Sequence, residues 1–91
     1  MDKMTAESRK DRAAIVAVLL AAKNKPEKAG LYADSYLEYQ EAQENISRNG
    51  SVVSDSRTGA AVQNPYLPVR DKAFARLEAL HKAGVRAADL W

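Results

Sequence analysis

Clustered basic side chains are the residues of this chain best suited to chemistry, and the chemistry they offer is contact with phosphate. Lysine and arginine neutralise a phosphate backbone without base-specific geometry, so a cluster of positive charge is enough for binding. Two groups stand out, one near the start of the chain and one in its last quarter, where Lys82 and Arg86 follow. The first choice for phosphate contact is Lys3, Arg9, Lys10, Arg12, Lys23, Lys25 and Lys28, and the second is Arg70, Lys72 and Arg76.

Four carboxylates form a second candidate constellation in the middle of the chain. Asp34, Glu38, Glu41 and Glu44 are three or four residues apart, so they gather toward one side of a helix. Such a set can hold a divalent cation against phosphate, as in a metal-dependent nuclease. No histidine supports that use. We therefore interpret the set as a solvated acidic face or a docking surface for a basic neighbour, and we expect no metal site.

Catalytic and nucleotide-binding patterns are missing from the sequence. His81 is the single histidine, and no nucleophile, base and acid set surrounds it along the chain. We interpret it as a surface residue. Neither the dinucleotide-binding glycine pattern nor GxxxxGK[ST] occurs. The sequence therefore predicts no catalytic residue and no cofactor.

Composition indicates one small globular domain spanning residues 1–91. The chain is 46% hydrophobic and 29% charged, which is ordinary for a folded protein. It has no cysteine, which excludes disulfides and thiolate zinc sites and suits a reducing compartment. The longest apolar run, Ala13 to Ala22, is much shorter than the roughly 20 residues that cross a bilayer. We expect that run to form a core helix, with no membrane partner.

Charge is distributed in three blocks. Residues 1–28 carry a net charge of +3, residues 29–47 carry −4, and residues 48–91 carry +3, within a total of +2. A basic start and end around an acidic middle can present a phosphate-facing surface or complementary faces for self-association. Solvated helix faces without a partner explain the blocks equally well.

Capping and breaking residues predict a mainly all-α fold. Thr5 or Ser8 can cap a first helix over about 5–23, and Pro26 can open a second over about 26–49 that Gly50 ends. Two short β-prone runs around Gly59 predict a hairpin over about 51–63, leaning on helices or a neighbouring subunit. Asn64 as cap and Pro65 as first residue predict a third long helix over about 65–83, followed by a short C-terminal turn.

Apolar and aromatic side chains recur at helical spacing along the second and third predicted helices. Their spacings of three and four place them on single stripes, which we expect to pack in the core or between subunits. A domain of this size buries only about 60% of its unfolded surface, so self-association is a plausible source of stability. The stripes contain Tyr32, Tyr36, Tyr39, Val69, Phe74, Leu77 and Leu80.

The stretch from Leu31 to Gly84 resembles the small terminase subunits of tailed phages. The resemblance is carried by an ordered series rather than by any one motif: the acidic, Tyr-rich helix LYADSYLEYQEAQENI, the G-x-V-V at Gly50, a Gly-containing hairpin, Q-N-P at Gln63, and a final Leu-rich helix. The segment after Gly84 departs from the family pattern. The chain is also short for the family, so a separate helix-turn-helix reader of DNA is not expected.

The resemblance implies a non-catalytic subunit of the genome-packaging machinery in the host cell cytoplasm. Such a subunit assembles into a homo-oligomeric ring, binds double-stranded viral DNA, and recruits and regulates the large terminase subunit, an ATPase and nuclease. The basic groups would then contact DNA. An alternative from another class is a small helical adaptor or antitoxin-like regulator that binds a protein partner through the acidic helix without touching DNA.

Overall fold

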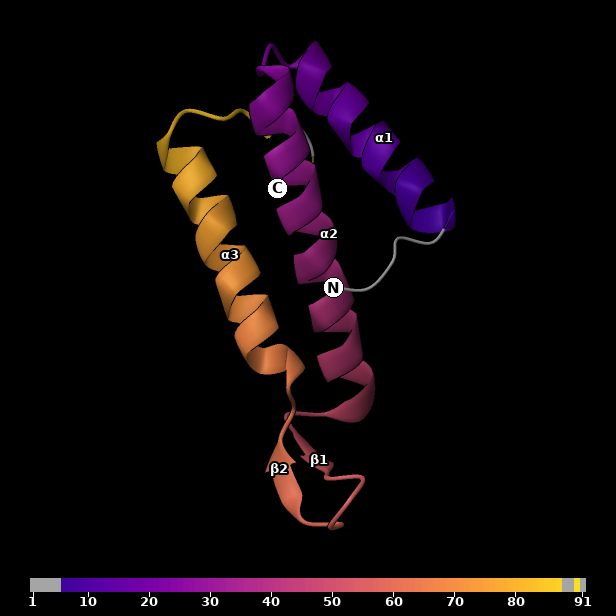
Figure 1. Ribbon diagram of the computed structural model, residues 1–91. Coiled ribbons are helices and arrows are strands. Elements are labelled where there is room, and N and C mark those ends of the chain that lie inside the picture. The colour runs from indigo at the N-terminus through magenta and orange to yellow at the C-terminus, as the bar shows by residue number, and fades with distance from the viewer. Residues whose placement is uncertain (1–5, 88–89, 91) are drawn as a thin grey trace.

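The computed structural model describes residues 6–87 and 90, and side chains from residue 11 onward. Three helices and one two-stranded hairpin make up the fold, which confirms the mainly α-helical prediction (Figure 1). The elements are α1 (Ala6–Ala21), α2 (Pro26–Asn49), β1 (Val52–Ser54), β2 (Ala61–Gln63) and α3 (Tyr66–Lys82). Part of the expected C-terminal turn, including Trp91, lies outside the described residues.

Helix α2 is the centre of the molecule. It packs against α1 on one side and against α3 along much of its length on the other. α2 and α3 run in opposite directions, and the hairpin joins them at one end of the molecule (Figure 1). The end of α1, the start of α2 and the segment after α3 meet at the other end, which we call the turn end.

Helices α1 and α3 end in the same way. Lys23 and Gly84 adopt positive φ angles of 73° and 96°. Beyond them, the Asn24 N–H donates to the Leu19 carbonyl at 3.2 Å, and the Val85 N–H donates to the Leu80 carbonyl at 3.0 Å. These are Schellman endings, which satisfy carbonyls that a helix end leaves open. Helix α1 thus ends at Ala21, two residues before the predicted end at residue 23, because Lys23 has already left the helical conformation.

The start of α3 differs from the prediction by one residue. Pro65 occupies the cap position, with φ −63°, and Tyr66 is the first helical residue. Asn64, predicted as the cap, lies just before it and is almost fully buried. Its Oδ1 accepts from the Tyr66 N–H at 2.9 Å, and its Nδ2 donates to Asn45 Oδ1 and to the Gly50 carbonyl, each at 2.9 Å. Asn64 therefore fastens the start of α3 to the end of α2.

The hairpin projects beyond the helices (Figure 1). β1 and β2 are antiparallel, with Val53 opposite Val62. Val52 is 61% exposed and β2 is exposed throughout, so the strands do not pack on the helices, which was one of the two supports predicted for the hairpin; the other, a neighbouring subunit, stays a prediction. Asp55 orders the tip, since its Oδ1 accepts from the Arg57 N–H at 2.7 Å. The Asn64 hydrogen bonds at its base therefore hold the hairpin in place.

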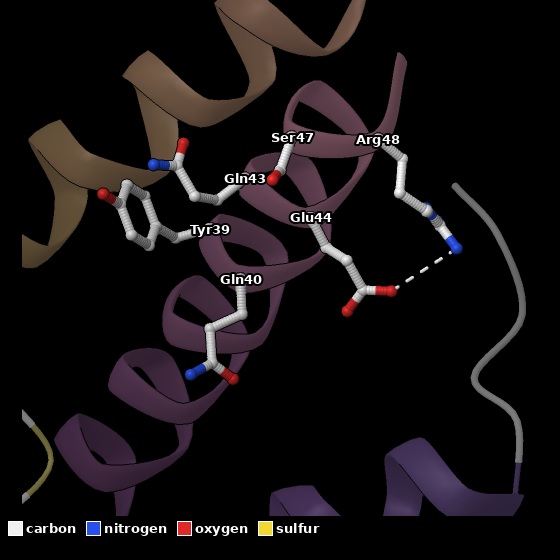
Figure 2. Close-up of a pocket in the computed structure, with 6 residues that line it drawn as sticks. All are labelled: Tyr39, Gln40, Gln43, Glu44, Ser47 and Arg48. Carbon is white, nitrogen blue, oxygen red and sulfur yellow. Dashed lines mark ion pairs between the residues drawn. The ribbon is translucent and has the colours of Figure 1, made fainter. Parts of the chain in front are cut away.

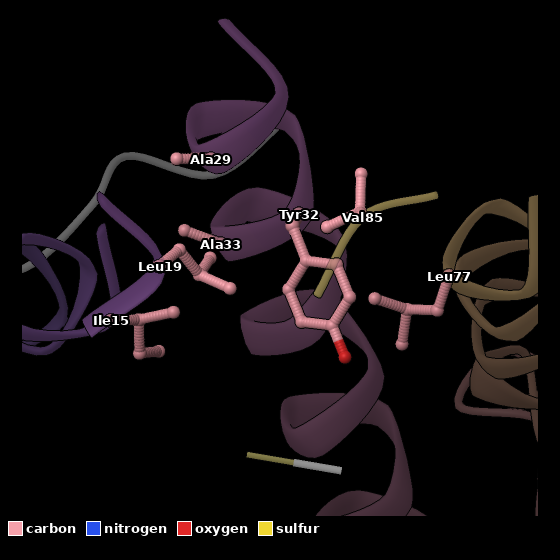
Figure 3. Packing of buried hydrophobic residues seen from close by; sticks show 7 residues of the cluster. All are labelled: Ile15, Leu19, Ala29, Tyr32, Ala33, Leu77 and Val85. Carbon is pink, nitrogen blue, oxygen red and sulfur yellow. The ribbon is translucent and has the colours of Figure 1, made fainter. Parts of the chain in front are cut away.

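Figure 3 shows the packing of the buried hydrophobic residues that form the core. α1, α2, α3 and the segment after α3 each contribute to it, and the Tyr32 ring of α2 is fully buried. Small side chains at Ala29 and Ala33 let α1 approach α2 closely. The buried cluster consists of Ile15, Leu19, Ala29, Tyr32, Ala33, Leu77 and Val85.

The predicted packing stripes occupy the contacts between α2 and α3 to different extents. Tyr32 and Leu77 are fully buried, whereas Phe74 is 37% exposed, with its ring centroid 5.9 Å from that of Tyr39. The remaining members are half-buried: Tyr36, Tyr39, Val69 and Leu80.

Candidate nucleic-acid interface

The turn end is held together by the side chain of Asn24. Its Nδ2 donates to the carbonyls of Leu19 at 2.8 Å and Arg86 at 2.7 Å, and its Oδ1 accepts from the Arg86 N–H at 2.9 Å. The two bonds to Arg86 join residues 62 positions apart in the sequence. The segment after α3 is thereby fixed beside the loop that connects α1 to α2.

This arrangement gathers four basic residues, which we call the basic turn: Lys23, Lys25, Lys28 and Arg86. All four are exposed, and none of their side chains forms an ion pair within the described part of the chain. Glu27 is an acidic neighbour in the first turn of α2. The basic turn therefore carries a positive charge whose donors are open to solvent.

The N-terminus of α2 adds to this charge. Its cap residue, Lys25, makes no side-chain capping hydrogen bond, and Pro26 opens the helix. A lysine side chain has only donors, so it cannot satisfy the free N–H groups of a first helical turn. Such groups and the helix dipole favour an anion, phosphate included. The geometry of the turn end thus suits a phosphate group.

Three other predicted contact residues are engaged in ion pairs. Arg12 of α1 reaches Asp34 of α2 through Nε at 2.6 Å, and this hydrogen bond with its charge raises the pKa of Arg12 above its ordinary value. Arg76 of α3 reaches Glu38 through Nη1, also at 2.6 Å. The third is Arg70, whose Nε lies 3.1 Å from Asp71 Oδ1. These arginines therefore help to hold the two outer helices against α2 or to balance neighbouring charge.

The remaining predicted contacts are distributed as follows. Lys72 is exposed on α3 and makes no ion pair within the described residues. Lys3 lies outside the described residues, as do the side chains of Arg9 and Lys10 on α1. Arg86 was not among the residues predicted for DNA contact, because its place after the last helix gave no sign that the chain returns to the α1–α2 loop.

The acidic set on α2 is partly neutralised within the chain. Asp34 and Glu38 bind arginines of the two neighbouring helices, and Glu44 pairs with Arg48 at 3.6 Å (Figure 2). Among the described residues, no three acidic or histidine side chains converge closely enough to hold a metal ion. Glu44 and Arg48 also line an open hollow on α2, and the other lining residues are Tyr39, Gln40, Gln43 and Ser47.

His81 is not the surface residue that the sequence suggested. It is half-buried, and its Nε2 lies 3.0 Å from the Tyr32 hydroxyl. The two rings meet edge to face, with centroids 5.4 Å apart. Burial raises the pKa of Tyr32 to about 12, with a smaller contribution from neighbouring Tyr36. This polar contact links α2 to α3 and belongs to the fold rather than to a reactive site.

These features define a small helical protein built on an antiparallel helix pair with a hairpin at one end and basic side chains at the other. The family model of the phage terminase small subunit matches residues 27–83, which contain nearly all of α2, the hairpin and α3. The chain therefore belongs to the phage terminase small-subunit family and to the machinery of phage DNA packaging. Helix α1 lies outside the matched region.

No curated protein and no solved structure shows a significant match to the chain. Small terminase subunits are generally regulatory rather than catalytic.

Within the described residues, none of the helices has the length and apolar character needed to cross a membrane.

Proposed function

We propose that this chain is the small terminase subunit that binds double-stranded viral DNA and presents it to the large subunit. The basic turn makes the principal DNA contact, through Lys23, Lys25, Lys28 and Arg86. The observation that carries this proposal is that these four side chains are exposed without ion pairs among the described residues, whereas three arginines elsewhere are paired. Membership of the family is the reason for proposing nucleic acid as the ligand.

The remainder of the proposal follows from the family. The antiparallel α2 and α3 with their hairpin serve as the unit that assembles into a homo-oligomeric ring, and the ring recruits and regulates the ATPase and nuclease of the large subunit. The small subunit itself performs no catalysis. A role in packaging phage DNA supports the host cell cytoplasm as the place where this assembly acts.

DNA binding is tested by fluorescence anisotropy with a labelled duplex over a range of salt concentrations. Each phosphate contact contributes about 0.9 to the slope of log affinity against log salt. Replacing both Lys25 and Lys28 by Gln is therefore expected to weaken binding and reduce that slope by about 1.8. The matched control replaces two other exposed bases that make no ion pair among the described residues, Arg57 and Lys72, by Gln, which removes the same charge far from the turn end.

The two variants distinguish a site from a general charge effect. A larger loss for the turn variant supports the basic turn as the contact surface. Equal losses would show that net charge alone governs binding, and no binding by the unaltered protein would favour the adaptor class. Stimulation of the large subunit's ATPase by the unaltered protein tests recruitment separately.

A further inference from the structure

The segment after α3 folds back to the turn end, where residues 85–87 form what we call the C-terminal strap. Val85 is 8% exposed and belongs to the same buried cluster as two side chains of α1. Figure 3 shows it beside the Tyr32 ring of α2. The Arg86 backbone both donates to and accepts from the side chain of Asn24. The strap is therefore fastened by a buried apolar side chain and by two hydrogen bonds.

Helix α1 is held on α2 mainly near the turn end. It reaches the buried cluster through Ile15 and Leu19, and Figure 1 shows it diverging from α2 toward its own start. Farther from the turn end, Arg12 pairs with Asp34, but the two side chains are 37% and 56% exposed. Exposed ion pairs contribute little to stability. The position of α1 thus depends on the buried cluster to which the strap also belongs.

Asn24 connects α1 to the strap. Its Nδ2 donates both to the carbonyl of Leu19 on α1 and to the carbonyl of Arg86 on the strap. Loss of the strap removes a partner of Asn24 and opens the cluster beside α1, and loss of α1 leaves Val85 in an incomplete cluster. Each segment therefore stabilises the other. Both lie outside residues 27–83, the region that matches the family.

We propose that α1 and the strap form a latch that opens and closes as one unit on the α2–α3 pair, and that duplex DNA at the basic turn holds it closed. The second part rests on the proposed function. The three lysines of the basic turn lie on the α1–α2 loop and in the first turn of α2, whereas Arg86 lies on the strap. Only the closed latch brings the four bases together. A ligand that binds only that state shifts the equilibrium toward it.

The latch connects DNA binding at the turn end to exposure of the α2 surface beneath α1. Ala29 and Ala33 are fully buried there, and both become exposed when α1 leaves α2. The coupling is reciprocal, because a change that opens the latch weakens duplex binding and bound duplex opposes opening.

Amide hydrogen exchange of the full chain without DNA tests the latch itself, because exchange reports local opening residue by residue. Val85→Ala changes only the strap and leaves Asn24 intact, yet it should speed exchange within α1 by roughly ten-fold through the lost core contact. Ile15→Val, a mild change in α1, should in turn speed exchange of the Arg86 N–H several-fold. Val62→Ala is the control, since this hairpin valine is 38% exposed.

Reciprocal effects confined to α1 and the strap support the latch. Faster exchange in the substituted segment alone would show that the two segments open independently. An equal increase throughout α2 and α3 would show that the whole chain opens as one unit, and either result overturns the proposal. Circular dichroism checks that each variant is folded. Arg12→Gln, which removes the exposed ion pair without touching the core, repeats the test of α1 if Ile15→Val folds poorly.

Exchange in the presence of saturating duplex tests the second part. The amides of residues 12–15 are followed, because they lie about 12 Å or more from Lys23 along the helix axis. Their exchange should slow several-fold in the unaltered protein. It should slow much less in Asn24→Ala at equal occupancy, because that variant lacks the bonds between α1 and the strap.

Two results would overturn the coupling to DNA: duplex binding without slower exchange in α1, and equal slowing in Asn24→Ala, which direct shielding by DNA would produce. Absence of duplex binding in the anisotropy assay would instead overturn the proposed function. Reciprocal exchange without DNA would still establish the latch in that case, so the two failures are distinguishable.

Discussion

The hydroxyl of Tyr32 on α2 lies 3.0 Å from Nε2 of His81 on α3, and the Tyr32 side chain is fully buried. This part-buried contact joins two helices through residues that are 49 positions apart in the sequence. Burying a hydroxyl group without a hydrogen-bond partner costs free energy. The contact with His81 offsets this cost for the buried Tyr32 side chain.

Tyr32→Phe is expected to lower the free energy of unfolding by about 1 kcal/mol at neutral pH, because a hydrogen bond within the core is lost. Urea denaturation followed by circular dichroism measures this change. His81→Ala provides the second arm of a double-mutant cycle, since it removes the other partner. Additive effects of the two substitutions would show that the contact contributes no coupling energy.

The raised pKa of Tyr32 predicts that the folded protein loses stability at high pH. The folded pKa of about 12 exceeds the ordinary tyrosine pKa of 10.0, so the unfolded chain releases this proton first. The stability due to the neutral phenol is therefore fully present below pH 10 and is lost as the pH rises toward 12. The difference in unfolding free energy between the unaltered protein and Tyr32→Phe should fall over this range. A difference independent of pH would contradict the burial of the phenol.

Asn64→Ala is expected to destabilise the chain by about 2 kcal/mol, because the substitution removes three hydrogen bonds made by an almost fully buried side chain. The Tyr66 N–H and the Gly50 carbonyl both lose their bond to this side chain. Hydrogen exchange should show the largest increase at the base of the hairpin and the first turn of α3. Asn45→Ala is the control, since it removes one of the same bonds but keeps the other two. Equal destabilisation by both variants would place the effect elsewhere.

Much of the fold could be predicted because its signals are local. Pro26 and Gly50 bound α2 through their own backbone preferences, and the helical spacing of Tyr32, Tyr36 and Tyr39 follows from neighbours along the chain. The bounds of α1 were less predictable. Lys23 follows the end of that helix with a positive φ that a lysine rarely adopts, so the residue type at this position did not predict the end of the helix.

The candidate site was only partly predictable because its geometry is non-local. The sequence identified Lys23, Lys25 and Lys28 as bases, but it could not show that Arg86 joins them. It also placed Arg12 and Arg76 in a DNA surface, whereas each binds a carboxylate of α2 from 22 or 38 positions away. Pairings of this kind depend on the way the helices pack, which composition and spacing do not encode.

Lys23→Gly separates stability from DNA binding at one position. Glycine adopts a positive φ without the steric cost that a side chain incurs, so we expect the variant to be more stable by about 0.5–1 kcal/mol. It also removes one charge of the basic turn, so duplex affinity should fall at low salt. Thermal denaturation and anisotropy measure the two effects. A variant that gains stability and keeps full affinity would remove Lys23 from the DNA contact.

Asn24→Ala tests whether the basic turn acts as an assembled surface. The substitution changes no charge, but it breaks the bonds that hold Arg86 beside Lys23 and Lys25. If the four bases must stand together to bind phosphates, duplex affinity should fall several-fold while the protein remains folded. Asn49→Ala is a matched control, since Asn49 is exposed at the far end of α2. A normal affinity for Asn24→Ala would show that the lysines act without Arg86, and that the DNA contact is confined to the α1–α2 loop.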